Sequence, residues 1–377
     1  MKKCILILLV CLPALVIAQG NKYTVQGAIG SFNAPAMMYL AYLDQTGKLF
    51  ISDSVVLTDG KFQLTGTCEN NCPQKATLAL NKNGTGFLKA TEYKTIYLEK
   101  GIVTVNGNNS LDSAAVAGTK ANLEFSRYIL ARKPVEDATN ALRARIQTTS
   151  EEERKLETFE KEMAKAFNGI TAQEMMIYKK FVQDNPGSFV SLEPLKSFAY
   201  RADYAETAPL FNSLTAAVKG SADGKKFAER LSRIKNLAPG AIAPEFTVAD
   251  TSGKMVSLSS LRGKYVLVDF WASWCGPCRK EFPNLIKALD HYKDQNFTIV
   301  GVSVDGRKDS WLKAIRKDGT TWTQLCDLKA EASETAQLYD INEIPQNFLL
   351  DPNGKIIAKH LMGEELEKRL AEILGKM

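Results

Sequence analysis

The stretch WASWCGPCRKEFP, residues 271–283, holds two cysteines, Cys275 and Cys278, separated by Gly276 and Pro277. A cysteine pair of this spacing can be half of a metal site, a structural disulfide or a reversible store of electrons. The elements around the pair, and the other residues able to work with it, decide between these three interpretations.

The pair lies where a predicted strand ends and a predicted helix begins. YVLVDFWA (265–272) is a continuous apolar run, as expected of a strand covered on both faces. A helix is expected from Cys275 to Tyr292 and a second buried strand at 297–304. The remaining elements expected of this α/β domain are a hairpin turning at Ser252-Gly253, a helix near 310–317, strands at 347–351 and 355–360, and a helix at 364–374. In open α/β sheets the end of a central strand is the preferred place for a site.

This position favours redox chemistry over a metal or a purely structural bond. A metal site needs about four ligands, and the chain's two histidines, His291 and His360, form no ligand pair with a nearby Cys or His. At a helix N-terminus, unsatisfied N–H groups and the helix dipole lower a cysteine pKa and so favour the nucleophilic thiolate. The second sulfur, one turn away, can resolve a mixed disulfide.

VLVDFWASWCGPCRKEFP resembles the active-site region of thioredoxins, and the likeness covers about residues 239–377. Asp269, six residues before Cys275, matches the buried acid of that family, and Pro283 matches the proline of its active-site helix. Ile344-Pro345 matches the dipeptide whose proline is cis beside the cysteines. Gln346 and Asn347 follow it where thioredoxins usually carry Thr, so the substrate platform is expected to differ.

Two features indicate the exported TlpA/ResA-like subgroup of the thioredoxin family. The stretch between Cys278 and Pro345 is longer than in a compact thioredoxin, and Glu281 matches the acid of that subgroup. An ordinary solvated helix residue is the alternative for Glu281. The resemblance implies catalytic roles for Cys275, Cys278, Asp269 and Glu281, and substrate contacts for Trp274, Gly276, Pro277, Ile344 and Pro345. No cofactor and no metal are expected.

The residues before this domain predict three further segments. MKKCILILLVCLPALVIAQG has the charged start, apolar run and small residues of a signal peptide at 1–18. Lipid attachment at Cys11 is disfavoured, because Val10 stands where such signals carry a small residue. Strand-like pieces with turn signals predict an antiparallel β-sandwich at 20–117, and helical periodicity follows at 118–236. A β-sandwich and helical segment before a TlpA-like domain resemble the DUF4369 arrangement of Bacteroidetes envelope proteins.

Helix signals divide the middle segment further. Ser150 with Glu153, and Thr171 with Glu174, have the spacing of capping boxes, and Asn168-Gly169 reads as a helix stop. The segment 236–246 contains two prolines and a glycine, which cannot continue a helix, and it marks the boundary before the domain at 239–377.

Charge and cysteine content restrict partners and compartment. Without residues 1–18 the formal charge falls from +6 to +4, because Lys2 and Lys3 leave and no acid does, which is no signature of nucleic-acid binding. Of seven cysteines, Cys4 and Cys11 belong to the signal. Cys68 and Cys72 are candidates for a local structural disulfide, and Cys326 is expected to be an unpaired, partly buried thiol.

We therefore predict a periplasmic thiol:disulfide oxidoreductase that reduces disulfides in exported proteins, including a role in cytochrome c maturation. Gly276-Pro277 brings no charge that would stabilise a thiolate strongly, so a reducing pair is expected. The resemblance suggests a membrane thiol-electron carrier as reductant. Two alternatives stay open: an envelope binding protein, and a thiol peroxidase, whose Pro and Thr positions are Val268 and Ala272 here. The sequence leaves the substrate and the oligomeric state undetermined.

Overall fold

The computed structural model of this 377-residue chain describes residues 21–44, 47–68 and 73–375. The predicted signal peptide, with Cys4 and Cys11, and Cys72 lie outside the described residues. The chain divides into two compact units: the described residues up to Ile177 with Gly187–Ser191, and Tyr178–Pro186 with the described residues from Leu192 onward. The predicted domain boundaries at 117 and 236 stay predictions.

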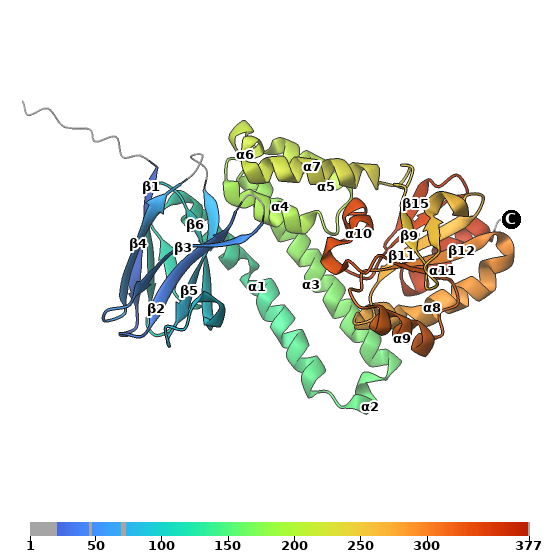
Figure 1. Ribbon diagram of the computed structural model, residues 1–377, viewed down its shortest axis with the longest axis horizontal. Helices are drawn as coiled ribbons and strands as arrows, with labels where there is room; N and C mark the ends of the chain where they lie inside the picture. Colours follow the sequence, from blue (N-terminus) through green and yellow to red (C-terminus); the bar gives the residue numbers. More distant parts are fainter. Residues whose placement is uncertain (1–20, 45–46, 69–72, 376–377) are drawn as a thin grey trace, which may run out of the picture. The chain divides into compact units, whose positions relative to one another are not determined.

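The first unit begins with two four-stranded sheets that enclose one apolar core (Figure 1). One sheet has the order β4-β1-β7-β8 and the other the order β3-β2-β5-β6. Alternate residues of β4, such as Phe62 and Leu64, point inward while their neighbours are exposed, as a sheet with one solvated face requires. The strands are β1 (Lys22–Ile29), β2 (Met37–Leu43), β3 (Leu49–Val56), β4 (Lys61–Thr67), β5 (Gln74–Asn81), β6 (Glu92–Leu98), β7 (Gly101–Gly107) and β8 (Ala115–Ala117).

One pairing corrects the expectation of a purely antiparallel sandwich. β1 pairs with β7 in parallel, with Val25 opposite Val103, whereas the other ladders of the two sheets are antiparallel. Local turn signals predict hairpins, but a parallel pair needs a long connection, and here the strands of the second sheet lie between the two partners in sequence. Such a pairing leaves no mark in local sequence.

Helices α1 (Lys120–Thr148), α2 (Glu151–Arg154) and α3 (Glu157–Asp184) follow the sandwich. The Ser150 side chain accepts a hydrogen bond from the N–H of Glu153, which is one of the two bonds of the predicted capping box. The predicted stop at Asn168-Gly169 and the new start at Thr171 are wrong, because α3 runs through all three residues. A glycine inside a helix costs only about 1 kcal/mol relative to alanine, which the burial of α3 residues such as Phe181 and Val182 outweighs.

The second unit contains a group of helices and an α/β domain (Figure 1). The helices are α4 (Leu192–Phe198), α5 (Tyr204–Ser213), α6 (Ala216–Gly220) and α7 (Ala222–Asn236). Asp203 and Glu206 form a capping box at the start of α5, and the Ser221 side chain caps α7 by accepting from the N–H of Gly224. Phe211 of α5 and Phe227 of α7 pack against each other, with ring centroids 5.2 Å apart.

The α/β domain is built on a five-stranded sheet of order β13-β12-β11-β14-β15. β11 (Tyr265–Trp271), β12 (Phe297–Ser303) and β13 (Thr323–Cys326) are parallel, while β14 (Gln346–Leu350) and β15 (Ile356–Lys359) pair antiparallel. The predicted hairpin turning at Ser252-Gly253 is formed by β9 (Thr247–Ala249) and β10 (Met255–Ser257). The predicted fold class, with an N-terminal sandwich, a helical middle and a thioredoxin-like α/β domain, is confirmed.

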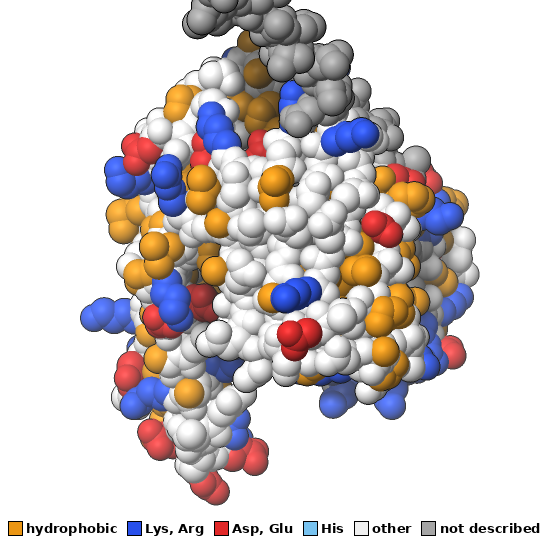
Figure 2. All heavy atoms as spheres, turned by 90° about the vertical axis from the view of Figure 1, so that its left-hand side faces the viewer, with side chains coloured by type: hydrophobic (Ala, Val, Ile, Leu, Met, Phe, Trp, Pro, Cys, Tyr) orange, Lys and Arg blue, Asp and Glu red, His pale blue; other side chains and the backbone are white. Residues whose placement is uncertain are grey.

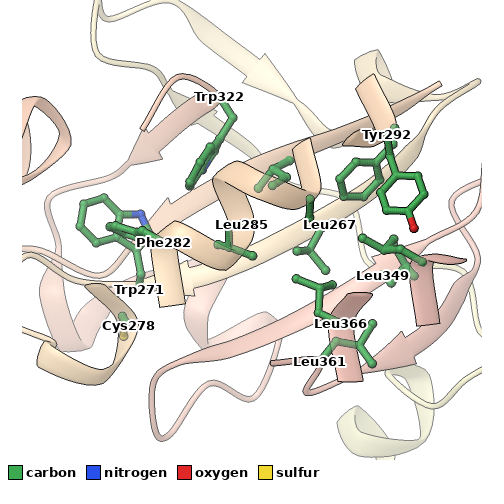
Figure 3. Packing of buried hydrophobic residues seen from close by; sticks show 14 of the residues in the cluster. Leu267, Trp271, Cys278, Phe282, Leu285, Tyr292, Trp322, Leu349, Leu361 and Leu366 are labelled. Atoms are coloured by element: carbon green, nitrogen blue, oxygen red, sulfur yellow. The ribbon is translucent and has the colours of Figure 1, made fainter. Parts of the chain in front are cut away.

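Helices α8 (Gly276–Tyr292), α9 (Lys308–Asp318) and α11 (Gly363–Leu374) contribute to a core that includes Leu267 of β11 and Leu349 of β14. Figure 3 shows the aromatic side chains of Trp271, Phe282 and Trp322 at one end of this core, near Cys278. The other residues of β11, Val266, Val268 and Phe270, belong to a second core with Tyr339, which follows α10 (Glu334–Leu338). Residues of β11 therefore alternate between two cores, and both faces are covered.

Figure 2 shows one face of the molecule on which hydrophobic side chains stand in small groups with charges of both signs between them. Of the large apolar side chains in the strands of the first unit, Leu43, Leu49, Phe50, Ile51 and Val56 are exposed on β2 and β3. Within the described residues, no helix is both long and apolar enough to cross a membrane.

Candidate active site

Cys275 and Cys278 are joined by a disulfide, with an S–S distance of 1.94 Å, at the N-terminus of α8. Cys275 is the N-cap residue, and its Sγ accepts a hydrogen bond from the backbone N–H of Cys278 at 3.2 Å. Pro277 occupies the first turn, where its missing N–H removes no helical hydrogen bond. Both cysteines are almost fully buried, with exposed fractions of 4% and 2%. An N–H directed at Sγ would also stabilise a thiolate there after reduction.

The loop before β14 comes directly against the cysteine pair. The carbonyl oxygen of Ile344 lies 3.8 Å from the Sγ of Cys275, and the Ile344-Pro345 peptide bond is cis. A disulfide sulfur carries no proton, so in the oxidised protein this approach is a packing contact. The predicted pairing of the cysteines with this dipeptide, 69 residues away in sequence, is therefore present in the structure.

Asp269 lies on β11 and shares the strand face of Leu267 and Trp271, which pack in the same core as α8. Its side chain is buried, with an exposed fraction of 3%. Burial raises the pKa of Asp269 to about 7, and the nearby Glu281 carboxylate acts in the same direction. A carboxyl group with such a pKa can accept and release a proton near neutral pH.

Glu281 is half-buried on α8, about one turn after Cys278, and it has two hydrogen-bond partners. Its Oε1 accepts from the backbone N–H of Gly363 at 2.6 Å, and its Oε2 accepts from Asn284 at 3.1 Å. Gly363 is the first residue of α11, where backbone N–H groups lack helical partners and a negative charge is favourable. Glu281 therefore satisfies the start of α11 and also acts electrostatically on Asp269.

The two tryptophans of the motif have different surroundings. Trp271 is fully buried, donates a hydrogen bond from Nε1 to Gln324 at 2.9 Å and packs edge-to-face on Phe282. Trp274 is 70% exposed, and Gly276 and Pro277 are exposed as well. Trp271 is therefore a core residue, while Trp274, Gly276 and Pro277 form the solvent-facing rim around the buried sulfurs.

A buried carboxylate that the sequence reasoning missed anchors the residues before Cys275. Asp305, 2% exposed, accepts from the N–H of Ser273 at 2.8 Å and from its hydroxyl at 2.6 Å. It also accepts from the hydroxyl of Ser303 at 2.7 Å. Asp305 follows β12 and so lies at the same sheet edge as Cys275, which was the only feature of the sequence that could have pointed to it. No local pattern could indicate the contact itself, because Ser273 is 32 residues away in sequence.

Other predicted residues lie near the site or inside the fold. Cys326, at the end of β13, is a buried thiol whose pKa burial raises, as expected of an unreactive cysteine. The Asn347 side chain bonds Leu361 through both its amide and its carbonyl, so it joins β14 to the chain beyond β15 and does not face the rim. Within the described part of the chain, no cluster of three or more His, Cys, Asp or Glu side chains could hold a metal ion.

The proposed Cys68–Cys72 disulfide falls partly outside the described residues. Cys68 is buried in the sandwich core, burial raises its pKa, and it has no disulfide partner among the described residues. Cys72 lies outside them. The pairing stays a prediction.

Comparison with known proteins agrees with this geometry. Residues 239–359 match the AhpC/TSA family and residues 23–125 match a domain of unknown function, DUF4369. The thiol-disulfide oxidoreductase ResA of Bacillus subtilis is 34% identical over 123 residues, which are 33% of this chain and 67% of that protein. The chain belongs to the ResA-like thiol-disulfide oxidoreductases. ResA of Geobacillus kaustophilus is 33% identical over 36% of this chain and 79% of its own length.

Solved structures similar to this oxidoreductase cover little more than a third of its chain. The thioredoxin domain of a thiol-disulfide oxidoreductase from Bacteroides vulgatus is 43% identical over 37% of this chain and 99% of its own, with a TM-score of 0.35. A putative thiol:disulfide interchange protein DsbE from Chlorobium tepidum is 34% identical over 37% of this chain and 99% of its own, with a TM-score of 0.34.

Proposed function

We propose that this oxidoreductase is an exported protein-disulfide reductase that works through Cys275 and Cys278. One observation carries the proposal: the two sulfurs form a disulfide at the N-terminus of α8, directly below an exposed rim and beside the Ile344 carbonyl. A pair that only stabilised the fold would need neither the capping N–H at Cys275 nor a buried carboxyl group with a pKa of about 7 in the same core.

The reaction proceeds by two thiol-disulfide exchanges. The Cys275 thiolate attacks one sulfur of a substrate disulfide, which forms a mixed disulfide and releases the other substrate sulfur as a thiolate. The Cys278 thiolate then attacks the Sγ of Cys275 and releases the second substrate sulfur. The substrate gains two electrons, and the protein is left with the Cys275–Cys278 disulfide that is described above.

Asp269 is the proposed acceptor of the proton that Cys278 must lose before the second exchange. Its pKa of about 7 means that a large fraction of it is ionised at neutral pH and can take the proton. Glu281 is the proposed tuning residue, because its charge is the second cause of that raised pKa. The role of Asp269 rests on its place on the face of β11 whose Leu267 and Trp271 pack in one core with Cys278, and that of Glu281 on its electrostatic effect on Asp269.

The rim is the proposed substrate platform. Trp274, Gly276 and Pro277 are exposed around Cys275, and the backbone near Ile344 lies beside the sulfur that attacks. An extended substrate segment would place its disulfide over Cys275 while its backbone pairs with the loop before β14. Disulfide-containing exported proteins are the proposed substrates, including apocytochrome c.

Two sequence features support the proposed reducing direction: the dipeptide between the cysteines and the predicted export. Gly276-Pro277 adds no charge that would strongly stabilise the reduced form, and the start of the chain predicts export to the periplasm. A reductase there needs electrons from the other side of the membrane. We propose a membrane thiol-electron carrier as the donor that returns Cys275 and Cys278 to the dithiol.

Insulin reduction in the presence of dithiothreitol tests the activity. The wild-type chain should accelerate precipitation of the insulin B chain, and Cys275→Ser should remove the acceleration; equal activity of both proteins would refute the proposal. Equilibration with glutathione buffers then tests the direction. A reduction potential well below about −200 mV supports a reductase, while a value near about −120 mV, typical of strong periplasmic oxidants, overturns that assignment.

A further inference from the structure

The loop from Tyr339 to Pro345 connects a buried anchor to the catalytic sulfurs. Tyr339 is fully buried and donates a hydrogen bond to the carbonyl oxygen of Pro244 at 2.6 Å. At the other end, the Ile344 carbonyl lies 3.8 Å from the Sγ of Cys275. The backbone between these two ends therefore determines where the Ile344 carbonyl lies beside Cys275.

Asp340 stands at the start of this loop in a backbone conformation that glycine usually adopts. The N–H of Asp340 bonds the carbonyl of Gln337, and the N–H of Ile341 bonds the carbonyl of Ala336, which is a Schellman motif at the end of α10. Asp340 has a φ of 49°, in the left-handed region. Glycine would fit this position without strain, so the presence of a carboxylate there calls for a reason.

Arg230 of α7 supplies that reason. Its Nε donates to the Oδ2 of Asp340 at 2.9 Å, and the two side chains are only 12% and 11% exposed. The same guanidinium donates to the carbonyl oxygen of Lys196 at 3.1 Å and lies over the ring of Tyr200, 4.3 Å from its centroid. A hydrogen bond to Lys196 and a cation–π contact with Tyr200 thus fix the position of the Arg230 side chain. Arg230 in turn holds Asp340 by a partly buried ion pair.

A second ion pair joins the same helices to the other side of β14. Lys359 of β15, whose side chain is 10% exposed, lies 2.7 Å from the Oδ1 of Asp203 at the start of α5. Lys359 stands opposite Phe348 of β14, which follows Pro345 by three residues. A cavity of about 30 Å³ is lined by residues of both ion pairs, among them Arg230, Asp340 and Lys359. The two ion pairs therefore add to the packing of Tyr339 and Phe348 in this region.

We propose that Arg230 is a positioning residue: through Asp340, helices α4–α7 hold the loop that carries Ile344-Pro345 and thereby set the affinity for protein disulfides. The inference rests on the proposed function and extends it to residues outside the α/β domain. Arg230 contacts neither sulfur, so it takes no direct part in thiol-disulfide exchange at Cys275 and Cys278. Loss of the pair should change how a protein substrate docks and leave the exchange step and the redox potential as they were.

Asp340→Asn is the sharpest variant, because asparagine tolerates the left-handed conformation and keeps an acceptor oxygen but removes the charge. Arg230→Gln removes the charge from the other side. The double variant completes a cycle in which the second substitution should cost less than it does alone, because the bond between Arg230 and Asp340 is already lost. The contacts of Arg230 with Lys196 and Tyr200 stay outside that shared loss. Arg316→Gln, an exposed arginine of α9, is the matched control.

Hydrogen exchange of the full-length oxidised chain reads the position of the loop directly. In Asp340→Asn and Arg230→Gln, the hydrogen-bonded amides of residues 340 and 341 at the start of the loop should exchange about tenfold faster, while those of α8 keep the wild-type rate. Unchanged exchange in the loop would overturn the inference whatever the activity shows. Equally faster hydrogen exchange throughout the second unit would show that the Arg230–Asp340 ion pair only stabilises the fold. That result would also overturn the inference.

Kinetics then connect loop position to function. With insulin as substrate, KM should rise about fivefold to tenfold in either variant. The kcat, the reduction potential and the rate with the small disulfide 5,5′-dithiobis(2-nitrobenzoate) should stay within about twofold of the wild type and of Arg316→Gln. If the wild type reduces insulin and either variant has an unchanged KM, the inference is contradicted. A changed reduction potential in either variant contradicts it as well. If the wild type reduces no insulin, the proposed function fails instead, and hydrogen exchange decides the inference.

Discussion

The Oε1 of Glu281 accepts a hydrogen bond from the backbone N–H of Gly363 at 2.6 Å, so one side chain of the active-site helix α8 also satisfies the start of α11. The same carboxylate is the second cause of the raised pKa of Asp269. Glu281 therefore has a structural role, the hydrogen bond to Gly363, and an electrostatic role, its effect on the pKa of Asp269. Different substitutions of Glu281 can separate these two roles.

Glu281→Gln should retain the bond to Gly363, because the amide oxygen can accept, while it removes the negative charge. We expect the pKa of Asp269 to fall somewhat and to remain above its ordinary value, since burial is the larger cause. Glu281→Ala should lose both contacts and destabilise the protein by about 1–2 kcal/mol. Urea denaturation, and titration of the Asp269 carboxyl group by carbon-13 NMR, check both outcomes. An identical Asp269 pKa in Glu281→Gln and wild type would leave Glu281 with its structural contact alone.

Trp274→Ala tests the proposed rim. Because the side chain is 70% exposed, its removal should change the free energy of unfolding by no more than about 0.5 kcal/mol. The KM for insulin reduction should rise severalfold, since a large aromatic surface beside Cys275 is lost to the substrate. Trp271→Ala, the buried counterpart, should instead destabilise the protein by roughly 3–5 kcal/mol. A Trp274 variant with wild-type KM would remove that residue from the platform.

Asp305 should matter for the position of Cys275 through Ser273. Asp305→Ala leaves the Ser273 N–H and hydroxyl without their acceptor, which should cost about 2–4 kcal/mol and lower the rate of insulin reduction. Ser273→Ala loses one hydroxyl contact and should cost about 1 kcal/mol. Urea denaturation and insulin reduction at 25 °C measure the stability and activity of the two variants. A smaller loss of stability or activity in Asp305→Ala than in Ser273→Ala would contradict the prediction.

The parts of the site that sequence predicted are those encoded by local pattern or by family resemblance. The continuous apolar run of β11 and Pro277 after Cys275 placed the cysteine pair at a strand-to-helix junction, and the resemblance pointed to Asp269 and Ile344-Pro345. Asp305 and Arg230 were missed for the same physical reason. Each acts on a partner far away in sequence, 32 residues for Ser273 and 110 for Asp340, and no local periodicity records such a pair.

The fold shows the same limit. Continuous apolar runs predicted the buried strands of the α/β domain, and a capping residue predicted the helix start at Ser150, because these signals act within a few residues. The parallel pairing of β1 with β7 and the passage of α3 through Gly169 depend on tertiary packing, which overrides local turn and stop signals. Tertiary packing also explains why Glu281 bonds Gly363, 82 residues away, where the sequence offered only a site acid or a solvated residue.

Asp269→Asn gives a prediction about pH, because the pKa of Asp269 is raised to about 7 by burial and then by Glu281. A raised pKa means that the folded protein holds this proton more tightly than the unfolded chain does. The resulting stability is fully present below pH about 4 and is lost as the pH rises through about 7. The asparagine side chain of the variant carries no such proton, so the variant should lose less stability than the wild type over this range, by roughly 2–4 kcal/mol.

Urea denaturation of the oxidised proteins at about pH 4.5 and about pH 8, on either side of the raised pKa, measures this difference. Asp290→Asn, at an exposed position on α8, is the control and should follow the wild-type profile. Parallel profiles for wild type and Asp269→Asn would show that Asp269 is ionised in the folded protein at both pH values. A carboxylate already ionised at the lower pH would be too weak a base for the proton of Cys278, so the proton-acceptor role would fall with it.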